Sequence, residues 1–312
     1  MTKPALLMTG AYPAGEMEAL EKEFDLLRLW EAPDQAAFIA AHAPHIRAIA
    51  TRGDLGASGQ LIAQLPKLEM IGCFGVGVDG IDLAACRARG IAVSNTPDVL
   101  TEDVADLAFA LMLGIARHIA QADAFTRAGL WAKGSYPLLT RLNRKRLGIL
   151  GLGRIGMAIA RRAEGFAMDI SYCTRNPVSG VAYKHYGSAA ELAAHSDFLV
   201  AIVPGGAATH NLVDEKVLTA LGPNGFFINV ARGSVVDENA LLAALEAKAI
   251  AGAALDVFWN EPAINPRFFP LQNVVLHPHG GSGTVETRRA MGQLVRDNLA
   301  AHFAGRPLLT PV

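Results

Sequence analysis

The stretch LGILGLGRIGMAIARR, residues 147–162, decides the fold. Its glycines Gly151, Gly153 and Gly156 fit the pattern G-x-G-x-x-G, with an apolar run before them and a helix-forming run after them. In such a unit the glycines allow a tight turn, a close approach of the backbone to a pyrophosphate, and close packing of helix on sheet. Amides at the helix start and the helix dipole attract the anion. The stretch predicts a dinucleotide-binding strand–turn–helix unit, and the alternative is a purely structural glycine turn.

The residues about 20 positions after this turn indicate which dinucleotide binds. NAD sites usually carry an Asp or Glu there, which binds the ribose hydroxyls. Here the next apolar run ends in Thr174, Arg175 and Asn176, with no acid. Arg175 would pair with a 2′-phosphate through charge-assisted bonds of about 1.5–3 kcal/mol, a preference of about 10- to 100-fold. We therefore expect NADP(H) to be preferred, with NAD(H) usable; the alternative is that Arg175 is a solvated loop residue stacking on adenine.

Composition limits the class of protein. The chain has 312 residues, is 51% hydrophobic and 18% charged, and carries a formal net charge of -1. This length suits two domains, and the charge gives no reason to expect nucleic acid or a membrane as partner. No run reaches the roughly 20 apolar residues that span a bilayer. The three cysteines, Cys73, Cys86 and Cys173, form no CxxC pair and indicate packing residues of a reduced, cytoplasmic protein.

Short apolar runs alternate with helical segments along the whole chain, which predicts an α/β fold with parallel sheets. A long helix over 101–128, with Thr101 as N-cap and Gly129 as stop, divides two such series; its apolar surface predicts burial between domains or subunits. A closing helix is expected over 285–303. The predicted strands are 6–10, 25–30, 46–50, 68–75 and 91–95, then 147–150, 169–173, 198–203, 226–230, 251–258 and 273–277.

Polar residues follow the second series of strands. In open α/β sheets ligands bind outside the carboxyl ends of the strands, and there the sequence places Arg232, Asp256, Glu261 and His279. One arginine, acids and one histidine at successive strand ends predict a catalytic site. His277 and His279 also form an H-x-H pair, but no further Cys/His cluster has ligand spacing, so no metal is expected.

Several motifs together resemble the D-isomer-specific 2-hydroxyacid dehydrogenase family. They are GLGRIG (151–156), NVARGSVVDE (229–238), ALDVFWNEP (254–262) and PHGGSGTVETR (278–288), and FGVGVDGIDL and NTPDVLTEDVADLAFALML extend the match toward the N-terminus. The likeness is strongest to NADPH-dependent hydroxypyruvate and hydroxyphenylpyruvate reductases, in which the position of Arg175 is also basic. One departure is Gly280, where the family usually has a branched apolar residue.

The resemblance implies two doubly wound parallel-sheet domains with a cleft between them. A Rossmann cofactor domain would span 98–283, and a discontinuous flavodoxin-like substrate domain would comprise 1–97 and 284–312. It also implies a homodimer built around the long helix, with the stretch 131–136 reaching toward the partner's substrate pocket.

The implied reaction is hydride transfer from NADPH to a small 2-oxo acid, giving the D-2-hydroxy acid. Glyoxylate and hydroxypyruvate are the expected substrates, with aryl-pyruvates as a further option. Protonated His279 would donate a proton to the ketone oxygen, and Glu261 would stabilise the imidazolium. Arg232 would clamp the carboxylate and polarise the ketone, while backbone amides of Val76 and Gly77 would also hold the carboxylate.

The remaining expected contacts belong to the cofactor and the substrate's side chain. Asp256 is expected to accept a hydrogen bond from the nicotinamide carboxamide. Residues 51–55 and Phe74 are candidates for the side-chain pocket, where Arg52 would meet a polar tail or form a structural ion pair. The full set of expected cofactor contacts is Gly151, Leu152, Gly153, Arg154, Ile155, Gly156, Thr174, Arg175, Asn176, Val203, Pro204, Thr209, Val230, Ala231, Arg232, Asp256, His279 and Gly281.

Two other functions are compatible with this scaffold. A non-catalytic dinucleotide-sensing regulator would not need Arg232, Glu261 and His279 together, and this chain has no long basic tail. A formate-type dehydrogenase carries an amide where this chain has Glu261. The sequence therefore favours the reductase over both alternatives.

Overall fold

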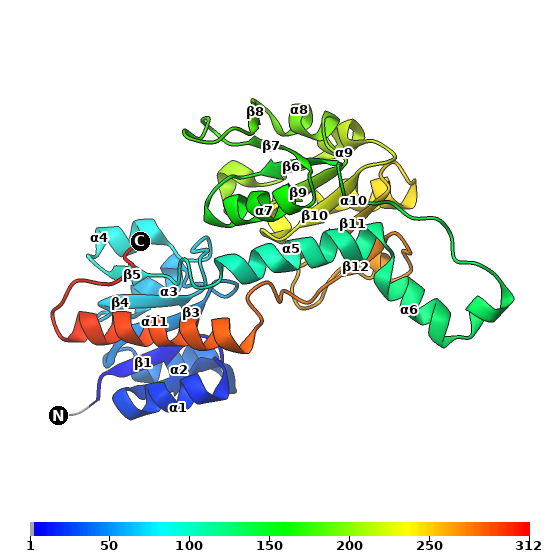
Figure 1. The fold of residues 1–312 in the computed structure, drawn as a ribbon. Helices are drawn as coiled ribbons and strands as arrows, with labels where there is room; N and C mark the ends of the chain where they lie inside the picture. Colours follow the sequence, from blue (N-terminus) through cyan, green and yellow to red (C-terminus); the bar gives the residue numbers. More distant parts are fainter. Residues whose placement is uncertain (1–2) are drawn as a thin grey trace. The chain divides into compact units, whose positions relative to one another are not determined.

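The computed structural model describes residues 3–312, which form two compact units. The first unit comprises the chain up to Leu100 together with Gly283–Val312, and the second is Thr101–Ser282. Each unit is built on a parallel sheet, of five strands in the first and seven in the second (Figure 1). The expected fold class, two α/β domains with parallel sheets, is confirmed.

The sheet of the first unit has the strand order β2-β1-β3-β4-β5, which is the flavodoxin-like order. Buried residues of α2, α3 and α4 form one core cluster with alternate residues of these strands. The strands are β1 (Ala5–Met8), β2 (Asp25–Arg28), β3 (Ile46–Arg52), β4 (Met70–Phe74) and β5 (Ala92–Ser94). The helices are α1 (Ala14–Glu23), α2 (Gln35–His42), α3 (Gly59–Gln64), α4 (Leu83–Ala88) and α11 (Val285–Phe303).

The C-terminal segment completes the first unit. Figure 1 shows α11 lying along the sheet beside α1, and a Cβ placed on Gly72 of β4 would lie 3.2 Å from Val295 of α11. Buried Asn298 holds the tail, because its Oδ1 accepts hydrogen bonds from the amides of Leu309 and Thr310 at 3.0 and 3.1 Å. The last thirty residues are therefore an integral part of this core.

The sheet of the second unit has the order β12-β11-β10-β9-β6-β7-β8, which is the six-strand Rossmann order with one more strand, β12, added at one edge. Every predicted strand overlaps an observed one, but β8 was not predicted, since KHY is short, polar and at the sheet edge. The strands are β6 (Arg146–Leu150), β7 (Asp169–Cys173), β8 (Lys184–Tyr186), β9 (Phe198–Ala201), β10 (Phe226–Asn229), β11 (Gly252–Leu255) and β12 (Val274–Leu276).

The predicted single helix over 101–128 is wrong. Helix α5 (Thr101–Ala116) ends before His118, which has φ +48°, and α6 (Ile119–Arg127) begins after it. A left-handed residue cannot continue a right-handed helix. The apolar face of α5 packs on α7 and on β10 and β11 of its own unit, with Ile115 3.2 Å from a Cβ placed on Gly252. That face is therefore already covered and is not a free surface for a partner.

The other helices of the second unit flank its sheet. Helix α7 shares a face with α5, whereas α8, α9 and α10 contribute to a second apolar cluster. Ser188, Asp214 and Asp237 cap α8, α9 and α10 by accepting backbone amides, as expected for N-cap residues. The bounds are α7 (Arg154–Gly165), α8 (Ala189–Ala194), α9 (Glu215–Leu221) and α10 (Glu238–Glu246).

Candidate active site

The glycine turn joins β6 to α7 at the point where the strand order reverses. Gly151 has φ +99°, and a Cβ there would lie 2.9 Å from the carbonyl oxygen of Ile202 after β9. A Cβ on Gly156 would come within 2.1 Å of the Gly151 oxygen, so the turn and helix fit together only with glycine at both positions. A Cβ on Gly153 would meet nothing within 4 Å, which leaves the approach to the α7 amides open. The turn therefore suits a phosphate group.

The segment after β7 carries the three residues expected to choose the dinucleotide. Arg175 and Asn176 are exposed, and within residues 3–312 Arg175 forms no hydrogen bond or ion pair. Thr174 donates its hydroxyl to the carbonyl of Asn176 at 2.7 Å, and its own carbonyl accepts from His185 Nε2 at 3.0 Å. The loop is thus held by its backbone and by Thr174, while the guanidinium of Arg175 is available to an anion.

The other expected cofactor contacts lie after β9 and β10. Thr209 donates its hydroxyl to the carbonyl of Pro204 at 2.6 Å, which closes the loop after β9. Val230 and Ala231 are buried, at 6% and 4% exposed, and their contact with the cofactor stays a prediction. Val203 is half-buried.

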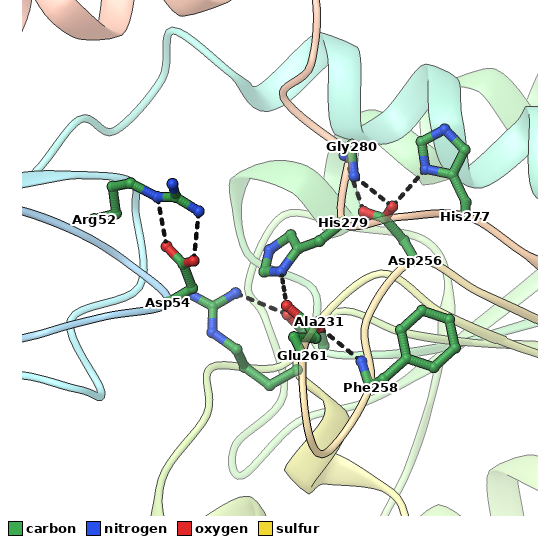
Figure 2. A network of polar contacts seen from close by, with 11 residues as sticks. Arg52, Asp54, Ala231, Asp256, Phe258, Glu261, His277, His279 and Gly280 are labelled. Carbon is green, nitrogen blue, oxygen red and sulfur yellow. Dashed lines mark hydrogen bonds and ion pairs between the residues drawn. The ribbon is translucent and has the colours of Figure 1, made fainter. Parts of the chain in front are cut away.

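His279 and Glu261 are in direct contact. The Nδ1 of His279 lies 2.5 Å from Oε2 of Glu261, whose Oε1 accepts the amide of Phe258 at 2.7 Å (Figure 2). An ionised carboxylate only accepts, so Nδ1 carries the hydrogen. The other nitrogen, Nε2, makes no hydrogen bond to a described residue, and the His279 side chain is 35% exposed. The pair has the arrangement of a proton donor oriented by an acid.

Asp256 is buried directly after β11 and anchors the turn that carries His279. Its carboxylate accepts hydrogen bonds from the amides of Gly280 and Gly281 at 2.7 and 2.9 Å and from His277 Nδ1 at 2.6 Å. A carboxylate has about four acceptor positions. The carboxamide contact expected of Asp256 would therefore have to use the last of them, and it stays a prediction.

The loop that carries Arg232 is fixed by residues that the sequence did not single out. Buried Asn229 donates Nδ2 to the carbonyl of Arg232 at 2.9 Å and accepts the amide of Ala231 at 3.0 Å. A Cβ on Gly233 would lie 2.1 Å from the carbonyl of Phe258, so this loop packs backbone to backbone on the segment before Glu261. The only sequence feature that could have indicated Asn229 and Gly233 is their closeness to Arg232 along the chain. Their role is shown only by these contacts.

In the first unit the expected carboxylate-binding turn follows β4. The carbonyl of Val76 accepts Asn95 Nδ2 at 2.8 Å, and the carbonyl of Gly77 accepts the thiol of Cys73 at 3.6 Å. The amides of Val76 and Gly77 donate to no residue in the described part of the chain. Free amides on a turn whose carbonyls are fixed suit an anion.

The candidate pocket residues fall into two classes. Thr51 and Phe74 are buried; Thr51 bonds the carbonyl of Gly56 at 2.6 Å, and the Phe74 ring packs on Tyr12 with centroids 4.5 Å apart. Both belong to the core of the first unit, and a part in a side-chain pocket stays a prediction for them. Arg52 instead forms a two-pronged ion pair with Asp54 at 3.0 and 2.6 Å, which is the structural alternative considered for it.

The described residues show neither a metal-ligand cluster nor a membrane-spanning helix. Over residues 3–312 the side chains form no group of three or more His, Cys, Asp or Glu able to hold a metal ion. In the same range, no helix has the length and apolar character needed to cross a bilayer.

Comparison with known proteins gives consistent matches. Residues 109–281 match the family model described as D-isomer specific 2-hydroxyacid dehydrogenase, NAD binding domain. The chain is 50% identical over 293 residues to glyoxylate/hydroxypyruvate reductase A of Arabidopsis thaliana, covering 94% of both chains. It is 49% identical to hydroxyphenylpyruvate reductase of Plectranthus scutellarioides, covering 95% of this chain and 94% of the relative.

A solved structure extends these matches to three dimensions. It is the NADPH-dependent glyoxylate/hydroxypyruvate reductase of Sinorhizobium meliloti in complex with NADP and malonate. The TM-score is 0.94 at 44% identity, over 100% of this chain and 97% of that one.

Proposed function

The chain belongs to the D-isomer-specific 2-hydroxyacid dehydrogenase family, and we propose that it reduces a small 2-oxo acid to the 2-hydroxy acid with NADPH. The observation that carries this proposal is the contact between His279 and Glu261, in the same unit as the glycine turn. In this proposal the second unit binds the dinucleotide and the first binds the substrate. A regulator that only senses a dinucleotide would have no use for a proton donor.

NADP(H) is the cofactor that this site favours, with NAD(H) usable. The Sinorhizobium meliloti relative, which is 44% identical, was solved with NADP. In this chain the glycine turn would hold the pyrophosphate, and exposed Arg175 would pair with the 2′-phosphate. When bound, the reduced cofactor supplies the hydride.

The chain's own residues supply the proton and hold the substrate. As hydride reaches the carbonyl carbon, the carbonyl oxygen takes a proton from Nε2 of protonated His279. Glu261 remains ionised and keeps Nδ1–H oriented. Arg232 clamps the carboxylate and polarises the ketone, and the amides of Val76 and Gly77 hold the carboxylate.

The substrate class is that of small 2-oxo acids. The relatives are described as reductases of glyoxylate, hydroxypyruvate and hydroxyphenylpyruvate. A bound glyoxylate needs only the carboxylate and carbonyl contacts above, whereas larger 2-oxo acids also need room for a side chain. We therefore place glyoxylate and hydroxypyruvate first, with aryl-pyruvates as the second candidate.

A homodimer in a reducing compartment such as the cytoplasm is part of the proposal. Helix α6 has no buried residue, and the segment that follows it exposes Trp131 at 70% and Leu138 at 101%. Figure 1 shows α6 extending away from the sheet of its unit. In this proposal a second copy packs on α6 and the segment after it, residues 119–138, rather than on α5. Residues 131–136 then reach toward the substrate pocket of that second copy. Light scattering should show a dimer that Trp131→Glu weakens.

The test of function is a panel of three substrates with two cofactors. Glyoxylate, hydroxypyruvate and phenylpyruvate are each mixed with NADPH or NADH, and the loss of absorbance of the reduced nicotinamide is followed. We expect turnover with NADPH well above that with NADH. No turnover in any combination, with NADPH still bound tightly in a fluorescence titration, would replace the reductase with the regulator.

A further inference from the structure

We propose that His277 is a positioning residue, which acts through Asp256 and together with Gly280 to fix the turn that carries His279. The proposal rests on the proposed function, because the turn positions the proton donor of that reaction. It assigns a role to two features that the reaction leaves unused: the first histidine of the H-x-H pair, and the glycine directly after the proton donor.

The first step concerns the backbone of His279. This residue has φ +48°, a left-handed conformation that costs free energy in any residue with a side chain and persists only when its surroundings impose it. Asp256 provides that restraint. Its carbonyl accepts the amide of His279 at 2.9 Å, and its carboxylate accepts the next two amides, those of Gly280 and Gly281. The turn is therefore fastened to the end of β11.

The second step concerns the carboxylate of Asp256 itself. The residue is 2% exposed, so a missing hydrogen-bond partner would be costly. His277 Nδ1 lies 2.6 Å from Oδ1, the oxygen that also accepts the amide of Gly280. Because the carboxylate only accepts, the imidazole donates, and a neutral ring with its hydrogen on Nδ1 is sufficient. His277 thus fixes the oxygen that holds the residue next to His279 (Figure 2).

The third step explains the glycine. A Cβ on Gly280 would lie 2.4 Å from Cε1 and 3.2 Å from Nδ1 of His277. The ring cannot turn away without breaking its bond to Asp256. Any side chain at 280 would therefore displace either the ring or the turn, so residues 277 and 280 are coupled.

The same geometry separates the two histidines chemically. His277 Nδ1 bonds Asp256, whereas His279 Nδ1 bonds Glu261 (Figure 2). The H-x-H pair is thus a pair of histidines on two different carboxylates. One orients the proton donor's turn and the other is the proton donor.

The test is a cycle of four variants, assayed with NADPH and the best 2-oxo acid. His277→Asn keeps an N–H at the position of Nδ1 but lacks Cε1, and His277→Leu removes the donor. We expect kcat to stay within about threefold of wild type in His277→Asn and to fall about tenfold in His277→Leu, with the KM for NADPH unchanged, because misplacing a catalytic group costs rate rather than cofactor binding.

The coupling between positions 277 and 280 is measured by comparing the kcat of Gly280→Ala with that of the double variant His277→Asn/Gly280→Ala. We expect kcat to fall about tenfold in Gly280→Ala and to recover to within about threefold of His277→Asn in the double variant, since the clashing Cε1 is gone. A double variant no better than Gly280→Ala, or equal losses in His277→Asn and His277→Leu, would overturn the proposal. Unchanged melting temperatures exclude a general loss of folding.

A second readout does not depend on activity. Nitrogen-15 spectra of the histidine rings should show several imidazoles with their hydrogen on Nδ1, those of His277 and His279 among them, and His277→Asn identifies the signal of His277 by removing it. A ring at 277 with its hydrogen on Nε2 refutes the positioning role even in an active enzyme. Conversely, a locked Nδ1–H in a protein that reduces no 2-oxo acid refutes the proposed function and leaves the turn's architecture standing.

Discussion

Two carboxylates at opposite ends of the seven-stranded sheet, half-buried Asp197 and buried Asp256, have very different partners. Asp197 precedes β9 at the amino end, where it takes two bonds from the guanidinium of Arg146, at 3.3 and 2.8 Å, and one from its amide. Burial acts to raise the pKa of Asp197, but the bonds from Arg146 outweigh it and hold the pKa below its ordinary value. Asp256 follows β11 at the carboxyl end and has only backbone amides and an imidazole as partners.

The difference distinguishes a structural ion pair at the amino end from the candidate active site at the carboxyl end. At the amino end an opposite charge occupies the carboxylate, and the pair joins the starts of two strands. At the carboxyl end the carboxylates of Asp256 and Glu261 are held by groups without a fixed charge, and each contacts a histidine. The carboxyl end thus places its carboxylates against histidine side chains, whereas the amino end closes its carboxylate in an ion pair.

The largest effect is expected from removing the proton donor. His279→Gln keeps a polar side chain of similar size, but it cannot give up a proton, so kcat should fall about 10²- to 10⁴-fold. NADPH binding, followed by fluorescence, should be nearly unchanged. Turnover close to that of wild type would show that the working site lies elsewhere.

A smaller effect is expected from Glu261→Gln, which keeps an acceptor for Nδ1–H but removes the charge that stabilises the imidazolium. We expect a loss in kcat of about 10- to 100-fold, because the proton donor loses the charge that orients and stabilises it in the reaction. A kcat equal to that of wild type would contradict this role.

The next effect concerns the cofactor only. Arg175→Ala should raise the KM for NADPH about tenfold or more and leave the KM for NADH unchanged, since only NADPH carries a 2′-phosphate. Lys216→Ala, an exposed cation on α9 of the same unit, serves as the matched control. Equal changes for both cofactors would mean that Arg175 stacks on adenine instead.

The smallest effect should appear at the amino end of the sheet. Asp197→Asn should lower the free energy of unfolding by about 1 kcal/mol at pH 7 without changing kcat. Because the pKa of Asp197 is lower in the folded state, its contribution is full above the ordinary aspartate pKa and is lost as the pH falls through the folded value. Urea unfolding should show a smaller difference in the free energy of unfolding between wild type and Asp197→Asn at pH 3 than at pH 7. An equal difference at both pH values would contradict the pairing of Asp197 with Arg146.

The contrast also shows what the sequence could predict. The glycine turn and the polar residues at the strand ends could be predicted from the sequence. The turn depends only on local spacing, and the strand ends follow from the rule that ligands bind at the carboxyl ends of parallel strands. The end of α5 could not be predicted, because nothing in the sequence around His118 indicates that this residue adopts a left-handed conformation. Nor could the contact between Asp256 and His277, which are 21 residues apart and meet only because β11 and β12 are neighbours.

The discontinuity of the first unit orders events during synthesis. Its five strands are made first, yet the helix that covers β4 lies after the whole second unit in the chain. The second unit can therefore fold on the ribosome as soon as it has emerged, while β4 of the first unit still lacks the helix that covers it. Until α11 packs on β4, this nascent chain exposes apolar strand surface, which makes the interval before α11 is synthesised the one most in need of a chaperone.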